Sequence, residues 1–471
     1  MVDAIDTQDS ISFPDIEISE ELVRRFDVSG PRYTSYPTAD RFDYTFKQER
    51  FLPYLQERGQ GGANPPLSVY FHLPFCRSLC YFCACNKIIT QDYGRSAQYV
   101  RYVCKEMDLL APHLGNDRRT VQLHLGGGTP TFMSNDELAM LMDATRRHFE
   151  FTPDAELGVE IDPRTVNEDT LSFLAGLGFN RCSFGVQDFD PAVQAAVNRI
   201  QPVEMVEQAV QASRDTGYES VNADLIYGLP KQTLESFKRT IDEIIRISPD
   251  RIALYNYAHL PARFKAQRMV KPEDLPSAET RLQIFLLSTR RLLEAGYVYI
   301  GLDHFAKPAD ELNLARQDKS LHRNFQGYTT RAECDLIGFG VSAIGKVGNS
   351  YSGNVRTVNA YYESLDAGRL PVERGYDLSA DDVLRREVIM ILMCSMPLRF
   401  AEVGEKHGID FESYFAPELE RLRPYEEVGF MQRQDGVITV TPKGRLFVRA
   451  LGMVFDKYLN QPTVSTYSRL I

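Results

Sequence analysis

Residues 72–85 read HLPFCRSLCYFCAC and contain four of the eight cysteines of the chain. Cys76, Cys80 and Cys83 are separated by three and by two residues, a spacing that lets one loop ligate three irons of an iron–sulfur cube. The fourth iron then stays open for an external chelator. Structural zinc is the alternative, but it usually takes two cysteine pairs, and no second pair follows here. Cysteines that merely fill a core are a third interpretation, which the crowding of four thiols directly after a strand disfavours.

Short β-rich runs alternate with helix-length amphipathic segments between about residues 66 and 300. The predicted strands are 67–73, 121–125, 157–161, 182–187, 221–226 and 252–257. Segments such as 99–114 and 234–247 are long enough to be the helices that connect them. Six strand–helix units predict a parallel sheet, either open or bent into a partial barrel.

Polar or reactive residues follow five of these strands at their carboxyl ends. They are Cys76 after the first strand, residues 126–130 (GGGTP) after the second, Glu160 and Asp162 at the third, Gln187 at the fourth and Asp224 at the fifth. Parallel sheets and barrels bind ligands at this edge, so we predict one site there. Taken singly, Asp162 and Asp224 have a second interpretation as caps of the next helix.

The glycine run is not a Walker A phosphate loop, because that motif requires Lys after its last glycine and Thr129 follows Gly128 here. A plain turn is the simplest interpretation. Without Cβ atoms, however, Gly127 and Gly128 let the backbone approach a ligand closely, and their carbonyl oxygens can accept from an ammonium group.

The 471 residues suggest about three domains, or one large catalytic body with smaller appendages. Asp and Glu number 64 against 53 Lys and Arg, and the net charge of −11 disfavours broad binding of nucleic acid. No apolar stretch approaches the roughly 20 residues that span a bilayer, and residues 1–10 (MVDAIDTQDS) lack the features of an export signal. We expect a cytoplasmic monomer that binds neither nucleic acid nor membranes.

Three domain ranges are predicted: an N-terminal arm (1–55), a catalytic domain (56–375) and a mainly helical C-terminal domain (376–471). Two prolines within residues 30–38 forbid regular helix in that part of the arm. In the C-terminal domain the predicted elements are helices at 381–395, at 400–407 and from 417 to about 423, a strand at 436–441 and a final helix from 442. That order is a winged-helix outline.

The cysteine spacing, its place after a first strand, Phe82 before the third cysteine and the glycine-rich second strand end together resemble the radical S-adenosylmethionine (SAM) superfamily. In that superfamily a [4Fe-4S] cluster binds SAM at its open iron and donates one electron that cleaves the C5′–S bond. Four more features are similar to the oxygen-independent coproporphyrinogen III oxidase family. They are residues 30–38 (GPRYTSYPT), Cys85, residues 159–164 (VEIDPR) and residues 323–330 (RNFQGYTT). This second resemblance extends from about residue 22 to the C-terminus.

The resemblance implies a fold, an activity and partners. The fold is α/β, a partial (β/α)6 TIM-like barrel of the radical SAM type, with the N-terminal arm and the winged-helix-like C-terminal domain. The activity is oxidative decarboxylation of coproporphyrinogen III. The 5′-deoxyadenosyl radical takes a hydrogen from the β-carbon of a propionate, and loss of CO2 and of one electron to an acceptor leaves a vinyl group. Two such events, on rings A and B, give protoporphyrinogen IX. The implied electron source is a low-potential donor such as flavodoxin or ferredoxin, and no residue is assigned as a catalytic base.

The resemblance also implies the contacts of the [4Fe-4S] cluster and of two SAM molecules. Cys76, Cys80 and Cys83 would hold the cluster, and the role of Cys85 as ligand, redox participant or packing residue stays open. The SAM at the cluster would contact Tyr70, Gly127, Glu160 and Ile344. A second SAM would contact Phe82, Gly128, Thr129, Gln187, Arg199, Asp224 and Ala258. One departure is Gly353, where the family is expected to carry a longer polar side chain.

Coproporphyrinogen III carries four propionates, so a protein with net negative charge needs cations placed locally to hold it. Arg32 and Arg323 are predicted for this role, because they lie in irregular segments where a guanidinium group can pair with a carboxylate bidentately. The alternative interpretation of each is a solvated surface charge.

Two other functions compete with this one. A haem-binding chaperone related to the family keeps the three-cysteine motif, but it has an aromatic residue in place of Cys85 and lacks the segment 324–330. Both features favour the enzyme. A metal-sensing regulator would read DNA through the C-terminal domain, where acidic residues offset the basic ones that a recognition helix needs.

Overall fold

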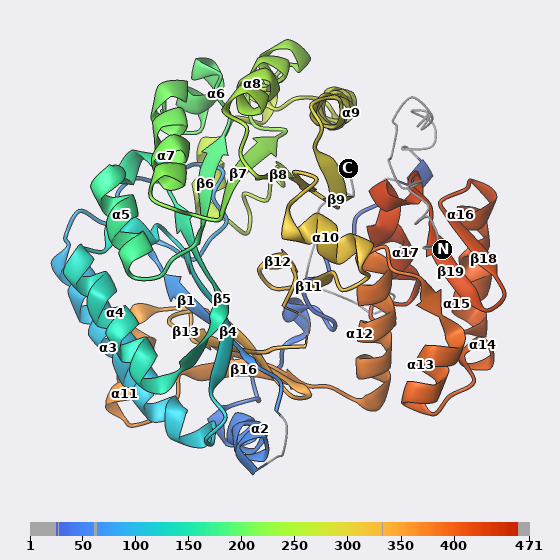
Figure 1. The fold of residues 1–471 in the computed structure, drawn as a ribbon, viewed down its shortest axis with the longest axis horizontal. Coiled ribbons are helices and arrows are strands. Elements are labelled where there is room, and N and C mark those ends of the chain that lie inside the picture. Colours follow the sequence, from blue (N-terminus) through green and yellow to red (C-terminus); the bar gives the residue numbers. More distant parts are fainter. Residues whose placement is uncertain (1–24, 27, 61–63, 332, 460–471) are drawn as a thin grey trace, which may run out of the picture. The chain divides into compact units, whose positions relative to one another are not determined.

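The computed structural model of the chain describes residues 25–26, 28–60, 64–331 and 333–459. Its described residues form two compact units, each built from separate stretches of the chain (Figure 1). The sheet unit contains 37–281 and 331–383, and the helical unit contains the described parts of 1–36, 282–330 and 384–471. The predicted domain ranges 1–55, 56–375 and 376–471 divide the chain at other points and stay predictions. The predicted absence of an export signal and much of the predicted arm fall on residues 1–24, which lie outside the described residues.

The sheet unit confirms the six predicted parallel strands, which run side by side in chain order. They are β1 (Leu67–Leu73), β4 (Arg119–Gly127), β5 (Glu150–Ile161), β6 (Arg181–Gln187), β7 (Ser220–Tyr227) and β8 (Arg251–Asn256). All six carboxyl ends therefore meet at one edge, because neighbouring strands pair in parallel. Strand β1 is buried along almost its whole length, as a parallel strand covered on both faces must be.

The other edge of β1 pairs with a strand that lies far along the chain. Strand β13 (Asp335–Phe339) runs parallel to β1, with Leu67 opposite Asp335 and Phe71 opposite Phe339. Antiparallel strands then extend the sheet in the order β14 (Ile344–Val347), β15 (Ser350–Asn354) and β16 (Val372–Asp377). None of these four strands is among the six predicted ones.

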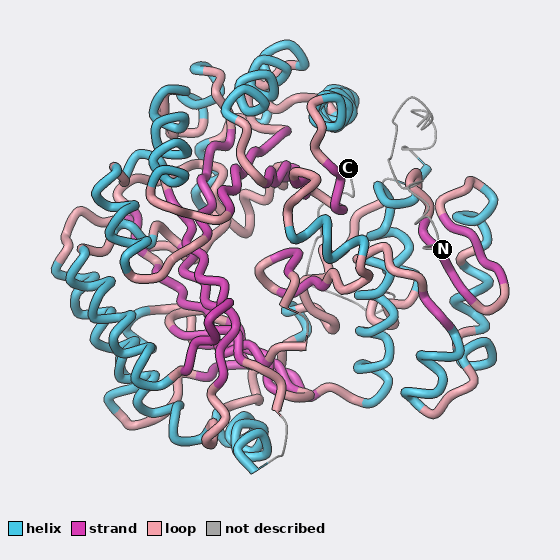
Figure 2. The backbone as a smooth tube through the Cα atoms, viewed as in Figure 1, coloured by secondary structure: helices cyan, strands magenta, loops and turns pink. Residues whose placement is uncertain are grey.

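Helices cover the outer side of the strands in the sheet unit (Figure 2). They are α2 (Gln48–Gln60), α3 (Gly94–Leu110), α4 (Asn135–His148), α5 (Glu168–Gly176), α6 (Pro191–Ala196), α7 (Val203–Asp215), α8 (Leu234–Ile247) and α11 (Val358–Asp366). Helix α8 shows why such segments form: Phe237, Ile241 and Ile244 bury one face, and Thr233 caps the first turn by accepting from the Ser236 amide.

Helix α3 differs from its predicted range of 99–114. It begins at Gly94 and ends at Leu110, where the short 3-10 turn η3 (Ala111–His113) takes over. Pro112 explains the early end, because proline has no amide hydrogen and disfavours a helical residue before it. The remaining short elements of the sheet unit are η2 (Ala39–Arg41), β2 (Phe75–Cys76), β3 (Ile88–Ile89), η4 (Pro130–Phe132), η5 (Pro163–Thr165), η6 (Lys265–Met269) and η7 (Pro272–Asp274).

The helical unit packs around its own apolar core, in which Phe400 and Phe411 stack with ring centroids 4.4 Å apart. Its helices include α10 (Glu311–Gln317), α13 (Phe400–His407), α14 (Phe411–Tyr414), α15 (Ala416–Arg421), α16 (Arg423–Glu427), η8 (Gly444–Phe447) and α17 (Val448–Val454). Helices α9 (Ala278–Glu294) and α12 (Ala380–Met393) begin in the sheet unit and end in the helical unit. Its strands are the pairs β9 (Val298–Gly301) with β10 (His304–Ala306) and β11 (His322–Asn324) with β12 (Gly327–Thr329), and the sheet β17 (Leu398–Arg399), β19 (Val437–Val440), β18 (Met431–Gln434).

The region predicted as one helix from 417 to 423 is divided between two short helices, α15 and α16. Pro424 lies in the first turn of α16, so the preceding helix ends at Arg421. The predicted strand 436–441 corresponds to β19, which pairs with both β17 and β18. Within the described residues, no helix combines the length and the apolar character that crossing a membrane would require.

Candidate functional site

The cysteine loop leaves the carboxyl end of β1 and is closed at its base by a small parallel ladder. Strand β2 pairs with β3, and the Ile88 amide donates to the Pro74 carbonyl oxygen at 2.7 Å. The outer side of the loop is held by a neighbouring turn, where the Asn198 side chain donates to the Leu79 carbonyl oxygen at 2.8 Å. The loop is thus fixed at both its base and its middle.

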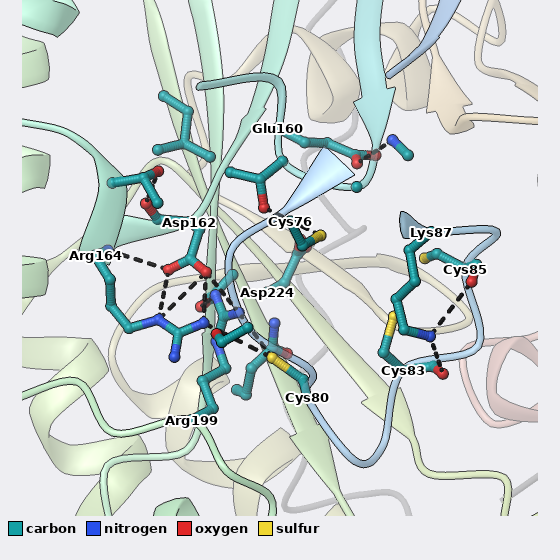
Figure 3. Close-up of a pocket in the computed structure, with 18 of the residues that line it drawn as sticks. Cys76, Cys80, Cys83, Cys85, Lys87, Glu160, Asp162, Arg164, Arg199 and Asp224 are labelled. Atoms are coloured by element: carbon teal, nitrogen blue, oxygen red, sulfur yellow. Dashed lines mark hydrogen bonds and ion pairs between the residues drawn. The ribbon is translucent and has the colours of Figure 1, made fainter. Parts of the chain in front are cut away.

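The thiols of this loop face a cavity of about 450 Å³ at the carboxyl edge of the sheet (Figure 3). Most of the residues singled out from the sequence line it. They come from the cysteine loop and from four successive strand ends, except Arg199, which lies in the loop between α6 and α7. These residues are Cys76, Cys80, Phe82, Cys83, Gly127, Gly128, Thr129, Glu160, Gln187, Arg199 and Asp224. The cavity lies wholly within the sheet unit.

The glycine turn packs against the beginning of the cysteine loop. The Gly128 amide donates to the Leu73 carbonyl oxygen, and the Thr129 amide donates to the Phe75 carbonyl oxygen, both at 2.8 Å. A Cβ atom on Gly128 would lie 2.6 Å from the carbonyl carbon of Pro74, so only glycine permits this approach. Gly127 has a φ of +108°, which side-chain-bearing residues rarely adopt. The turn therefore requires glycine at both positions, and contact of its carbonyl oxygens with a ligand stays a prediction.

Glu160 lies near the end of β5, and its Oε2 atom accepts from the Gly127 amide at 3.1 Å. Its Oε1 atom lies 3.4 Å from Nε2 of His124. Burial acts to raise the pKa of Glu160, but the hydrogen bond from His124 and the Gly127 amide outweigh it, so the pKa is lowered. This carboxylate is therefore ionised at neutral pH and faces a cavity, where it can accept from ligand donors.

Asp224 lies at the inward-facing position of β7 and accepts from the Ser183 hydroxyl at 3.0 Å and from the Asn222 side chain at 2.9 Å. Burial, together with the charge of Glu160, raises the pKa of Asp224 to about 6. The two carboxylates thus titrate apart, with Glu160 charged first.

Asp162 holds two guanidinium groups beside the cysteine loop. Its Oδ2 atom accepts from Nη2 of Arg164 at 2.7 Å and from Nη1 of Arg199 at 3.1 Å. Burial acts to raise the pKa of Asp162, but the hydrogen bond from Arg164 and the charges of both arginines lower it overall. Both guanidinium groups also reach Cys80: Nη1 of Arg199 lies 3.5 Å and Nη2 of Arg164 lies 3.8 Å from its Sγ atom.

Three of the residues implied to contact SAM do not line the cavity. Tyr70 projects from β1, with its hydroxyl 3.2 Å from Nδ1 of His72 and its ring stacked on His124. Ala258 accepts from the Gln267 side chain at 3.1 Å, and Ile344 begins β14. These three assignments stay predictions.

The two arginines predicted to hold propionates belong to the helical unit. Arg32 is ion-paired with Asp303. Arg323 lies 4.9 Å from the ring centroid of Tyr328, and its Nη1 atom is buried without a hydrogen-bond partner in the described part of the chain.

Several residues that line the cavity were not predicted as site residues, among them Lys87, Arg164 and Ser183. A period-2 signal could have identified Ser183, because Ser183, Gly185 and Gln187 share one face of β6. Lys87 lies two residues after Cys85 and donates to the Cys83 carbonyl oxygen at 3.0 Å. Arg164 had no such signal, since it lies beyond the strand in the 3-10 turn η5.

The donor set fits an iron–sulfur cluster. Burial raises the pKa of the Cys76 thiol to about 11, so its thiolate needs the charge of a bound metal. Hydrogen-bond donors already face the sulfurs, including the Thr129 hydroxyl 3.5 Å from Cys76 Sγ. Among the described residues, no three His, Cys, Asp or Glu side chains converge on a single metal position. A cluster suits such an arrangement because each of its irons takes a different cysteine.

Family models match two parts of the chain. The radical SAM superfamily model matches residues 70–244, which contain the cysteine loop and the strand ends around the cavity. The HemN C-terminal domain model matches residues 378–447.

Curated proteins match almost the full chain. An oxygen-independent coproporphyrinogen III oxidase from Pseudomonas aeruginosa is 48% identical over 456 residues, which is 96% of this chain and 98% of the relative. The protein of the same name from Escherichia coli is 43% identical over 98% of this chain and 100% of its own. A solved structure described as coproporphyrinogen III oxidase (HemN) from Escherichia coli, a radical SAM enzyme, superimposes with a TM-score of 0.87 at 43% identity. It covers 91% of this chain and 98% of its own.

Proposed function

The chain belongs to the oxygen-independent coproporphyrinogen III oxidase family of radical SAM enzymes, and on this basis we propose that it converts coproporphyrinogen III to protoporphyrinogen IX in haem biosynthesis. The reaction would turn the propionates of rings A and B into vinyl groups. The observation that carries this proposal is the meeting of Cys76, Cys80 and Cys83 with the Gly127–Gly128 turn in one cavity.

The three cysteines would hold a [4Fe-4S] cluster with one iron left for SAM. When bound, the cluster supplies the electron that cleaves SAM to the 5′-deoxyadenosyl radical. The residues of the chain bind and orient the reagents. Glu160 is ionised and accepts from the Gly127 amide, so it suits the ammonium and hydroxyl donors of SAM. Tyr70 and Ile344 complete the proposed contacts of this SAM.

We propose a second SAM site at the neighbouring strand ends. Asp224 has a pKa of about 6, so at neutral pH its carboxylate accepts from hydroxyl groups. Gln187 offers a buried Oε1 atom that has no hydrogen-bond partner among the described residues. The remaining proposed contacts are Phe82, Gly128, Thr129, Arg199 and Ala258.

Arg32 and Arg323 are proposed to bind propionate groups of the substrate. Arg323 has the stronger support, because its Nη1 atom is buried and lacks a partner among the described residues. Arg32 already pairs with Asp303, so a propionate would share or replace that partner. The proposed electron donor is a low-potential carrier such as flavodoxin or ferredoxin, and we propose that the protein acts as a monomer.

Anaerobic reconstitution followed by an activity assay tests the function. The reconstituted chain is mixed with SAM, dithionite and coproporphyrinogen III, and the porphyrin products are oxidised and separated. We expect protoporphyrin and 5′-deoxyadenosine, and we expect the EPR spectrum of the reduced cluster to change when SAM is added. A cluster signal indifferent to SAM, or tight haem binding with no turnover, would overturn the proposal.

A further inference from the structure

Cys80 differs from the other cysteines of the loop in the donors that face its sulfur. Two cationic groups reach Cys80 Sγ: Nη1 of Arg199 at 3.5 Å and Nη2 of Arg164 at 3.8 Å. The Cys76 sulfur accepts a hydrogen bond from a neutral group, the Thr129 hydroxyl, at 3.5 Å. Cys80 is also the most enclosed of the three, with 8% of its surface exposed. The Cys83 sulfur is hydrogen-bonded by the Lys87 ammonium and by the Cys85 amide. What distinguishes Cys80 is that two guanidinium groups converge on its sulfur.

Arg164 is held in this position by a rigid arrangement. Its Nε atom donates to Oδ1 of Asp162 at 2.9 Å, while Nη2 donates to Oδ2 of the same carboxylate at 2.7 Å. This bidentate pair fixes the plane of the guanidinium group, and Asp162 also binds Arg199 at 3.1 Å (Figure 3). Asp162 and Arg199 are 9% and 8% exposed. The carboxylate thus aims two cations at one sulfur.

Hydrogen bonds to ligand sulfurs are one of the means by which a protein sets the potential of an iron–sulfur cluster. Reduction adds negative charge to the cluster, and a cationic N–H donor near a ligand sulfur stabilises that added charge. The Arg164 side chain is partly buried, at 21% exposed, and its partner Asp162 is 9% exposed, so the hydrogen bond to sulfur is stronger than it would be in water.

We propose that Arg164, clamped by Asp162, is a positioning residue that raises the reduction potential of the cluster through an N–H···S hydrogen bond to Cys80. This inference rests on the proposed [4Fe-4S] cluster. The role of Arg164 would be to raise the reduction potential of the cluster enough for a cellular electron donor to reduce it. Arg199 contributes to the same sulfur, but it also belongs to the proposed SAM contacts, so Arg164 isolates the effect.

The test is an anaerobic redox titration of the reconstituted full chain without SAM, followed by EPR. We compare the parent with R164Q and with R77Q. Arg77 is an exposed arginine of the same loop and cavity, and in the described part of the chain it donates to none of the cysteine sulfurs. In R164Q we expect the ratio of reduced to oxidised cluster at a fixed potential to fall about tenfold, a shift of about 59 mV to more negative potential.

R77Q removes the same charge without removing an N–H···S bond, so its potential should stay close to that of the parent because exposed charges are screened. A potential in R164Q equal to that of the parent would overturn the inference. An equal shift in R77Q would also overturn it, because net charge alone would then explain the change.

A second measurement uses the unmutated chain, so it does not depend on cluster assembly in a variant. The chain is labelled with 15N-arginine, and the reduced cluster is studied by pulsed EPR. We expect a 15N coupling in the absence of SAM, and its absence would overturn the inference. A parent chain that takes up no [4Fe-4S] cluster contradicts the proposed function itself. A parent with a cluster and turnover, but without these effects, contradicts only the role of Arg164.

Discussion

Gln187 shows how one backbone conformation prepares the cavity for a ligand. Its φ of +68° lies in the left-handed region, which costs free energy for a residue with a side chain. The pairing of β6 with β7 shifts register between Gly185 and Gln187, so one extra residue bulges from the ladder. The Gln187 side chain consequently lines the cavity with an Oε1 atom that lacks a partner among the described residues. A ligand with a donor group would satisfy that atom.

Gly128→Ala should weaken both the fold and cluster binding. The added Cβ would lie 2.6 Å from the carbonyl carbon of Pro74 and 2.7 Å from the carbonyl oxygen of Phe75. Both are backbone atoms, so no side-chain rotation can relieve the clash. We expect a loss of about 1–3 kcal/mol in the free energy of unfolding, as for other overpacked sites. Iron and sulfide bound per chain after anaerobic reconstitution should fall as well.

Gly176→Ala is the matched control, because nothing lies within 4 Å of a Cβ at that position. Gly176 ends α5, where alanine is the better helix former. We expect this variant to keep the iron content and the stability of the parent. Equal iron content in both variants would show that the close approach at Gly128 does not matter for the cluster.

Asp224→Asn should remove a pH dependence of SAM binding. Burial and the charge of Glu160 raise the pKa of Asp224 to about 6. The carboxylate accepts hydroxyl donors above that pH and loses this capacity when it is protonated. In the parent, SAM affinity should therefore fall as the pH drops through 6. At pH 8 the Asn variant should bind SAM roughly tenfold more weakly than the parent, the loss expected for one hydrogen bond to a charged group. Its SAM affinity should not change as the pH drops through 6.

Equilibrium dialysis of the reconstituted chain with labelled SAM between pH 5 and 8 measures this effect. Ser183→Ala is a useful companion, because the Ser183 hydroxyl donates to Asp224 Oδ2 and holds the pKa down. Its loss should move the midpoint of the pH dependence upward. An unchanged pH profile in the Asn variant would rule out Asp224 as the titrating group.

At the level of residues, the sequence could identify groups that chemistry marks strongly. Cys76, Gly127 and Glu160 stand at the carboxyl ends of predicted strands, and parallel pairing brings those ends together. Arg164 escaped because an arginine beyond a strand end has the same sequence signature as a solvated surface charge. Its function depends on Asp162, and only the folded turn η5 shows that pairing.

Helix α3 is tied to three other elements through the buried carboxylate of Glu106. The carboxylate accepts from the Gly340 amide after β13 at 2.8 Å and from the Asn354 side chain of β15 at 2.7 Å. It also accepts from the Tyr361 hydroxyl of α11 at 2.5 Å. Glu106 is 1% exposed. Such a buried group costs free energy unless its partners stay in place, so this network fixes the helix against the sheet.

Glu106→Gln should remove a pH dependence of stability. Burial raises the pKa of Glu106 from 4.5 to about 7. Between these values the folded state keeps a proton that the unfolded state has lost, so the free energy of unfolding of the parent falls as the pH rises through this window. The full change is roughly 3 kcal/mol, and it is complete above pH 7.

Urea unfolding at pH 5, 6, 7 and 8 compares the parent with Glu106→Gln. Other titrating groups act equally in both proteins, so the difference between the two curves isolates Glu106. We expect the stability of the parent relative to the variant to decline from pH 5 to pH 8. A difference that stays constant over this range would contradict the raised pKa.

At the level of elements, the strands with regular apolar runs were predictable, whereas the short strands β13 and β14 were not. The runs 67–73 and 182–187 coincide with β1 and β6. Strands β13 and β14 are only five and four residues long and contain glycine, so they carry little local signal. The pairing of β1 with β13 joins residues that are far apart in the chain, and no local pattern reports it.

At the level of the whole molecule, the residues that line the cavity all belong to the sheet unit, which is assembled from residues 37–281 and 331–383. A ligand that binds only the folded state stabilises the part of the molecule that forms its site. The cluster should therefore stabilise the sheet unit in particular.

Hydrogen exchange with and without the cluster tests this expectation. Compared with chelator-treated protein, the reconstituted chain should exchange more slowly in peptides that cover residues 73–90 and 126–130. Peptides from α13 and α15, in the helical unit, serve as the internal control and should exchange at the same rate in both samples. Equal protection of both groups of peptides would contradict a local effect.

Strand β1 receives one of its two neighbours from a part of the chain that is synthesised much later. The thiols of Cys76, Cys80 and Cys83 leave the ribosome long before Asp335–Phe339, the residues that pair with β1 as β13. Until then the nascent polypeptide carries an open strand edge beside a complete set of iron ligands, and such edges invite pairing with other chains. Protection of this edge must therefore last until nearly three quarters of the polypeptide has been synthesised.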